Sequence, residues 1–139
     1  MSSQFVTKAS ISISTIIIDQ GSKYLVTTND WPYLYNAGIA FSLPLSNTIA
    51  MIVGILLVLI LMRFGSTLYH GSWKRVFNVS LGLVIGGAIS NIIDRLHAPG
   101  VIDFIKLPYW PTFNLADIAV CSGIGILLVL LYLDSKQQV

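Results

Sequence analysis

Residues 49–61 read IAMIVGILLVLIL, an apolar run with no charged side chain. The run sits inside a longer apolar segment, residues 46–64, whose length is close to the roughly 20 residues that a helix needs to cross a bilayer. Residues 124–133 form a second run of the same kind. Because lipid offers no hydrogen-bond partner to the backbone, such runs predict membrane-spanning helices.

The composition also indicates a membrane protein. Of the 139 residues, 55% are hydrophobic and only 10% are charged, whereas a soluble domain usually carries about 25% charged residues. A water-soluble protein with so few charges would expose an apolar surface, so lipid must cover it. The net charge of +2 is small and the basic residues are scattered, which argues against a nucleic-acid partner.

We predict an all-α membrane protein with one domain, residues 1–139, built as a bundle of four transmembrane helices. The predicted spans are residues 8–26, 46–64, 76–93 and 115–133. Four spans place both termini on one side of the membrane. That side carries five basic residues, Lys8, Arg63, Lys74, Arg75 and Lys136, and the opposite side carries three, Lys23, Arg95 and Lys106. Since basic loops stay in the cytoplasm, we expect cytoplasmic termini.

Two segments, residues 24–45 and 94–114, then face outward. Both are too short and too interrupted by proline and glycine to span a membrane. We expect turns and a short strand pair in them. Their tryptophan and tyrosine side chains should lie at the membrane–water interface.

Polar residues gather at the outer ends of the predicted spans. Asp19 and Lys23 lie four residues apart near the end of the first span, so they share a helix face. The third span ends in a similar group, Asn91, Asp94 and Arg95. Ionisable residues inside a membrane segment are costly and usually functional, so this end of the bundle is the predicted site.

The other members of this polar group lie in the outer segments or at the start of the fourth span: Asn36, Asp103, Asn114 and Asp117. Some of the group have a purely structural interpretation. Asp19 and Lys23 can form an ion pair that lets both charges sit at the interface, and Asn114 can cap the fourth helix. Asp103 and Asp117 have no basic partner at helical spacing, so each should be protonated or lie beside another polar group.

Two carboxylates held close together share a proton, because ionising both is unfavourable. One can then act as a general base toward water while the other, protonated, polarises a carbonyl. Asp103 and Asp117 are the candidates for this aspartic-protease chemistry, although the sequence does not establish that they meet in space. No cluster of His, Cys and Asp residues has metal-ligand spacing, and no glycine-rich phosphate loop precedes a helix.

Five motifs occur in order along the chain: DQGSK at 19–23, NAGIAFS at 36–42, GGAISNIIDR at 86–95, VIDF at 101–104 and FNLAD at 113–117. In these motifs the sequence resembles the bacterial lipoprotein signal peptidases, also called signal peptidase II. Each motif is weakly specific alone, but five in order among four apolar spans are highly specific. Ser90 stands where the family usually has glycine, and the 13 residues between Asp103 and Asp117 make a shorter stretch than in many members.

The resemblance implies an intramembrane aspartic endopeptidase of the bacterial inner membrane, with its active site near the outer leaflet. Its substrates would be prolipoproteins whose cysteine already carries a diacylglyceryl group, and it would cleave the bond before that cysteine. Such an enzyme would need no metal or organic cofactor. It would act as a monomer among membrane lipids and be inhibited by the cyclic peptide globomycin.

The resemblance also implies a role for each residue of the polar group. Asp103 and Asp117 would be the catalytic pair. The substrate site would be lined by Asn36, Asn91, Arg95 and Asn114. The site would be supported by Asp19, Lys23, Gly38 and Asp94. The outer segment after the first span would form a small extracytoplasmic β-cradle with a short interfacial helix over the site.

Two other functions fit the residues when the resemblance is set aside. A small proton-coupled four-helix transporter would use intramembrane aspartates as proton relays, although transporters usually hold the key acid near the bilayer midplane. A non-enzymatic scaffold or lipid-binding subunit is the other, and it predicts that neutralising Asp103 or Asp117 leaves function intact.

Overall fold

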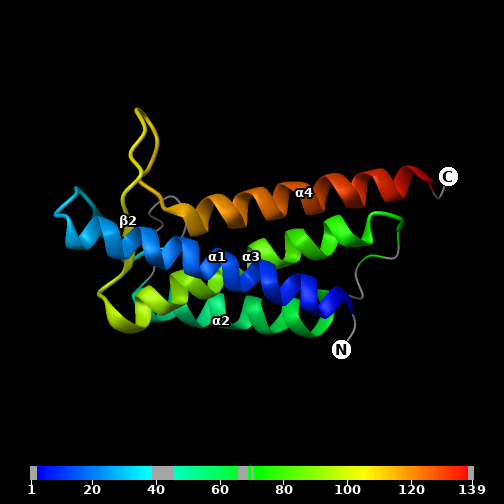
Figure 1. Cartoon of the computed structure of the whole chain (residues 1–139), viewed down its shortest axis with the longest axis horizontal. Coiled ribbons are helices and arrows are strands. Elements are labelled where there is room, and N and C mark those ends of the chain that lie inside the picture. The colour runs from blue at the N-terminus through cyan, green and yellow to red at the C-terminus, as the bar shows by residue number, and fades with distance from the viewer. Residues whose placement is uncertain (1–2, 39–45, 66–68, 70, 138–139) are drawn as a thin grey trace.

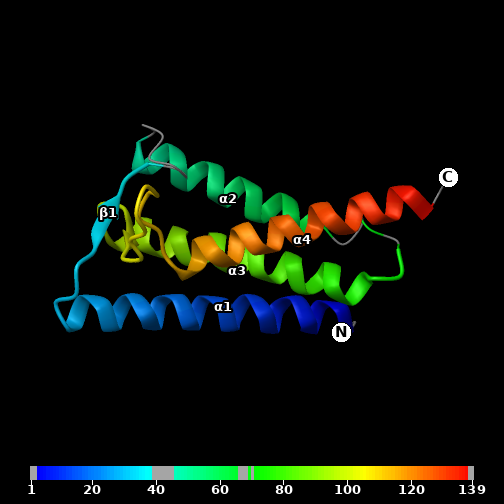
Figure 2. The same ribbon diagram turned by 90° about the horizontal axis from the view of Figure 1, so that it is seen from above.

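The computed structural model describes residues 3–38, 46–65, 69 and 71–137, which form helices and one small sheet (Figure 1). The elements are α1 (Ser3–Thr28), β1 (Leu34–Asn36), α2 (Asn47–Phe64), α3 (Lys74–His97), β2 (Val101–Asp103) and α4 (Leu115–Gln137). The start of α1 and the end of α4 lie at one end of the bundle, and the sheet lies at the other (Figures 1 and 2). The predicted helical fold is therefore confirmed.

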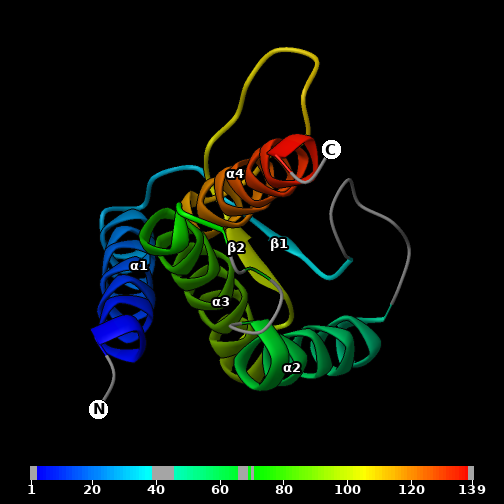
Figure 3. The same ribbon diagram turned by 90° about the vertical axis from the view of Figure 1, so that its right-hand side faces the viewer.

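α3 is the central helix. Seen along the bundle in Figure 3, it lies between α1, α2 and α4, and 56% of its apolar span is buried, against 11% for α2 and 17% for α4. Two adjacent glycines let its neighbours approach closely. A Cβ atom at Gly86 would lie 2.7 Å from the carbonyl oxygen of Ser12 on α1, and one at Gly87 would lie 2.5 Å from that of Ala116 on α4.

Three of the described helices are long and apolar enough to cross a membrane: Asn47–Phe64, Lys74–His97 and Leu115–Lys136, with mean hydropathies of 2.3, 1.8 and 2.3. They overlap the last three predicted spans. The largely exposed apolar surfaces of α2 and α4 suit contact with lipid.

α1 contains the first predicted span, residues 8–26, but is not among these apolar helices. Serine and threonine dilute its isoleucines. Some of these hydroxyls donate hydrogen bonds to backbone carbonyl oxygens. Ser12 Oγ donates to the carbonyl oxygen of Gly82 at 3.0 Å, and Thr15 Oγ1 donates to that of Ile11 at 2.9 Å. The helix is confirmed, while its crossing of the membrane stays a prediction.

The sheet at the far end joins the two predicted outer segments. β1 and β2 are antiparallel, with Leu34 opposite Asp103 and Asn36 opposite Val101. The predicted strand pair is therefore confirmed. The short interfacial helix is not seen among the described residues, and the part of the outer segment at residues 39–45 lies outside them.

An apolar core cluster lies near the other end of the bundle. Its members are Tyr69, Phe77, Leu81 and Leu130, each at most 5% exposed. The rings of Tyr69 and Phe77 stack with centroids 4.8 Å apart. This cluster fixes α3 and α4 at the end where the chain termini lie, and leaves the opposite end to polar contacts.

Candidate active site

Lys23 is buried between two aspartates at the sheet end of the bundle. Its Nζ atom lies 2.5 Å from Asp19 Oδ2 and 2.7 Å from Asp94 Oδ2, and the residue is only 2% exposed. The predicted pairing of Asp19 with Lys23 is confirmed, and α3 adds a second carboxylate. Buried charges persist only where partners and hydrogen bonds replace the lost hydration, and this ion cluster supplies both.

The two aspartates of the ion cluster hold other elements in place. Asp19 Oδ1 accepts a hydrogen bond from the backbone N–H of Ala116 at 2.8 Å, and Asp19 Oδ2 accepts one from Ser90 Oγ at 2.7 Å. Asp94 Oδ2 accepts one from the backbone N–H of Ile102 at 3.1 Å. The cluster therefore ties the first turn of α4 and strand β2 to the ends of α1 and α3.

Asn91 connects this ion cluster to Asp117. Its Oδ1 atom accepts a hydrogen bond from Lys23 Nζ at 3.1 Å, and its Nδ2 atom donates to Asp117 Oδ1 at 2.9 Å. A lysine only donates and an ionised carboxylate only accepts, so the two partners fix the orientation of the Asn91 amide.

Asn114 caps α4 and contacts both candidate catalytic residues. Its Oδ1 atom accepts from the backbone N–H of Asp117 at 2.9 Å, while Asp117 Oδ2 accepts from the backbone N–H of Asn114 at 3.2 Å. This reciprocal pattern is that of a capping box, so the predicted cap is confirmed. The Asn114 Nδ2 atom donates to Asp103 Oδ1 at 2.7 Å.

Asp103 is the last residue of β2 and is 1% exposed. Its Oδ2 atom accepts a hydrogen bond from Asn36 Nδ2, on the facing strand, at 3.0 Å. Burial raises the pKa of Asp103 to about 6, and the charge of Asp117 acts in the same direction, against the hydrogen bonds from Asn36 and Asn114. A carboxyl group with this pKa can exchange a proton near neutral pH, as general acid–base catalysis requires.

The structure thus brings the two candidate aspartates together. Asp103 and Asp117 bond to different atoms of Asn114, and they are close enough for the charge of one to affect the proton affinity of the other. Such a pair can hold a single proton between two carboxylates. Among the described residues, no group of three His, Cys, Asp or Glu side chains could hold a metal ion.

Arg95 holds the chain that leaves β1. Its guanidinium donates to the carbonyl oxygen of Gly38 at 2.5 Å and to Asn47 Oδ1 at 2.8 Å. The backbone N–H of Gly38 in turn donates to Asn36 Oδ1 at 3.0 Å. Arg95 and Gly38 therefore help to fix Asn36, which bonds to Asp103.

Three residues of this network were not among the predicted site residues. Gln20 Nε2 donates to Asp94 Oδ1 at 2.8 Å and to Ser90 Oγ at 3.1 Å, and Asn47 exchanges hydrogen bonds with Arg95. Gln20 lies inside the first motif, next to the predicted site residue Asp19, and this position could have identified it as part of the site. Nothing in the sequence distinguishes Asn47, because its hydrogen bonds to Arg95 depend on how α2 packs on α3.

The sequence model of the signal peptidase (SPase) II family matches residues 11–133 of this chain. The chain belongs to the signal peptidase II family. The family indicates a peptidase, and together with several apolar helices it indicates a multi-pass membrane protein. It does not favour the proton-coupled transporter.

Individual relatives agree with this assignment. The chain is 34% identical over 142 residues to a lipoprotein signal peptidase of Moorella thermoacetica, a match that covers 92% of this chain and 94% of the relative. It is 41% identical over 107 residues to one of Syntrophomonas wolfei, covering 76% and 70%. Its fold is similar to that of a bacterial membrane enzyme solved by the in meso method, with a TM-score of 0.83 and 25% identity over 96% of this chain and 92% of that one.

Proposed function

We propose that this chain is a lipoprotein signal peptidase that uses Asp103 and Asp117 as an aspartic catalytic pair. The observation that carries the proposal is the junction of buried Asp103 and half-buried Asp117 at Asn114. It occurs in a chain whose relatives are named lipoprotein signal peptidases. The proposed substrates are prolipoproteins with a diacylglyceryl group on cysteine, cut at the bond before that cysteine.

In the proposed reaction the two aspartates share one proton. The ionised carboxylate takes a proton from water, whose oxygen attacks the carbonyl carbon, while the protonated carboxyl gives its proton to the carbonyl oxygen. The tetrahedral intermediate collapses when the first aspartate passes its new proton to the leaving nitrogen and the C–N bond breaks. One hydroxyl of the intermediate returns its proton to the second aspartate, so the pair again holds a single proton.

The surrounding contacts suggest how the other residues would contribute. Asn36, Asn91 and Asn114 each donate a hydrogen bond to one of the two carboxylates. They would therefore orient the pair as well as line the substrate site with Arg95. Asp19, Lys23, Gly38 and Asp94 would support these residues from behind, through the ion cluster and the chain after β1.

The proposal places all four helices across the bacterial inner membrane. α1 would be the fourth span, since Ile13, Ile17 and Ile18 on it are 56%, 65% and 61% exposed and suit contact with lipid. The basic residues at the terminal end of the bundle favour a cytoplasmic location for that end. The sheet and the catalytic pair would then lie near the outer leaflet, as a β-cradle beside the lipid-anchored substrate.

The test is cleavage of a diacylglyceryl-modified prolipoprotein by the purified protein in detergent, followed on a gel. Asp103→Asn and Asp117→Asn should each abolish cleavage, and globomycin should block the wild type. Asp30→Asn is the matched control, because Asp30 is exposed and has a φ of 53°, a conformation that asparagine also tolerates. Each variant should show an unchanged thermal unfolding midpoint before its activity is compared.

Cleavage that survives either substitution in the pair would overturn the proposed catalytic residues while leaving a peptidase. A folded wild type that cuts no lipid-modified precursor would overturn the proposed activity. Loss of cleavage in the Asp30→Asn control would show that the assay responds to any change of charge on the outer side.

A further inference from the structure

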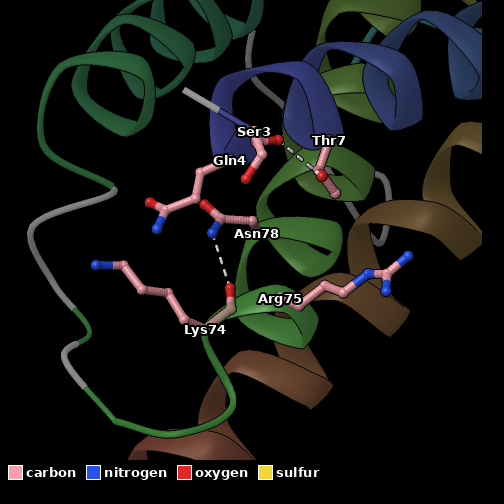
Figure 4. A pocket seen from close by; sticks show the side chains of 6 residues that line it. All are labelled: Ser3, Gln4, Thr7, Lys74, Arg75 and Asn78. Carbon is pink, nitrogen blue, oxygen red and sulfur yellow. Dashed lines mark hydrogen bonds between the residues drawn. The ribbon is translucent and has the colours of Figure 1, made fainter. Parts of the chain in front are cut away.

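A polar pocket of about 430 Å³ lies at the end of the bundle where the termini are, away from the candidate active site. It is lined from α1 and α3 by Ser3, Gln4, Thr7, Lys74, Arg75 and Asn78 (Figure 4). The proposed peptidase uses none of these residues, so the pocket needs its own explanation.

The first turn of α3, which forms one wall, concentrates positive charge. Lys74 and Arg75 are its first two residues, the turn contains no acidic residue, and the N-cap residue Trp73 makes no side-chain capping bond. The start of a helix already carries a partial positive charge and unpaired N–H groups. Within the described part of the chain, no carboxylate pairs with either basic side chain. A bound anion would neutralise this charge and accept hydrogen bonds from the unpaired N–H groups.

Asn78 is a second, independent indication that the pocket binds a ligand. The residue is 1% exposed, and its Nδ2 atom donates to the Lys74 carbonyl oxygen at 2.8 Å, as drawn in Figure 4. That bond fixes the amide so that Oδ1 is the other terminal atom, and Oδ1 finds no hydrogen-bond partner in the structure as described. A buried acceptor without a donor is costly, so the ligand should carry a hydroxyl or ammonium group.

We propose that this pocket binds the phosphoglycerol headgroup of an anionic phospholipid. The phosphate would lie against Lys74 and the first N–H groups of α3. The exposed Arg75 side chain extends to the opposite side of the helix in Figure 4 and would turn toward the phosphate, while a glycerol hydroxyl would donate to Asn78 Oδ1. The apolar span of α3 begins at the same level, which is the depth of the headgroups. Basic pockets between membrane helices commonly hold anionic headgroups in this way. A soluble phosphate ester has the same chemistry, and the experiment separates the two sources.

The experiment measures lipid retention by the full-length protein in detergent, using native mass spectrometry with three dioleoyl lipids. Phosphatidylglycerol has the charge and the hydroxyl, phosphatidylmethanol has only the charge, and phosphatidylcholine has no net charge and no donor. Affinity should fall in that order. Lys74→Gln with Arg75→Gln should weaken phosphatidylglycerol binding about 30-fold, because each basic residue near an anionic headgroup contributes a factor of roughly five in affinity. Asn78→Leu should abolish the preference for phosphatidylglycerol over phosphatidylmethanol.

The matched control is Arg63→Gln with Lys136→Gln, which removes the same charge from the last turns of α2 and α4, outside the pocket. It should leave phosphatidylglycerol binding unchanged, and an equal loss in this control would overturn the proposal. Equal retention of phosphatidylcholine by the wild type would do so as well. Displacement by sn-glycerol 3-phosphate at equal concentration would overturn the lipid assignment in favour of a soluble ester. Thermal unfolding confirms that each variant is folded, and no arm depends on peptidase activity.

Discussion

Replacing Lys23 by methionine should destabilise the protein by about 3–5 kcal/mol, the cost of removing one partner from a buried ion pair. Methionine keeps the length of the side chain but leaves Asp19 and Asp94, which are 0% and 4% exposed, without a counter-charge. Two uncompensated carboxylates place the expected loss at the upper end of this range. On the scale of globular domains it corresponds to a fall of roughly 10–20 °C in the unfolding midpoint.

Thermal unfolding in one detergent at pH 7, followed by circular dichroism, measures this loss. Lys136→Met is the control: it removes the same charge from an exposed position and should change the free energy of unfolding by less than about 0.5 kcal/mol. Adding Asp19→Asn and Asp94→Asn to Lys23→Met removes every charge of the ion cluster and should recover part of the stability. A Lys23→Met variant as stable as Lys136→Met would refute the reasoning.

Three further predictions concern the catalytic pair and the helix contacts. Because burial raises the pKa of Asp103 to about 6, the pair should keep its shared proton up to about that pH and lose it as the pH rises. The alkaline limb of kcat/KM for the lipid-modified precursor should therefore lie at or above about pH 6, and a limb below about pH 5 would contradict this. Ser90→Ala removes the hydroxyl that donates to Asp19 and should lower the free energy of unfolding by about 1 kcal/mol. It should also lower kcat more than it raises KM, and an unchanged unfolding midpoint and kcat would contradict this prediction. Gly87→Ala forces a methyl group against the α4 backbone and should lower the free energy of unfolding by about 1–3 kcal/mol. Gly125→Ala places its new atom with nothing within 4 Å and should not lower the free energy of unfolding; equal effects of the two substitutions would rule out the packing argument.

Where apolar runs were uninterrupted, the sequence located the helices well. The span predicted over residues 46–64 matches α2, Asn47–Phe64, because Ser46 Oγ accepts from the backbone N–H of Ile49 and begins the helix at that point. α3 continues past the span predicted over 76–93, as far as His97. Its polar end stays helical because the side chains there have partners on other elements, which hydropathy does not reveal.

The candidate site was predicted by residue type but not by contact. Asn36 bonds to Asp103 across 67 positions of sequence, and no helical or strand period relates residues so far apart. The second partner of Lys23, Asp94, likewise comes from another helix. Spacing within one helix predicted Asp19 beside Lys23 and the cap at Asn114, whereas the contacts between elements required the fold.

The bond between Asp19 and the backbone N–H of Ala116 has a consequence for how the protein is made. It joins the first helix to be synthesised to the last, so this bond and the cap beside Asp117 cannot form while α4 is still in the ribosome. A nascent chain with three inserted helices holds Asp19 and Lys23 but lacks Asn114 and Asp117. The proposed peptidase would therefore become active only when translation is nearly complete, and a chain that terminates early would release no partial protease into the membrane.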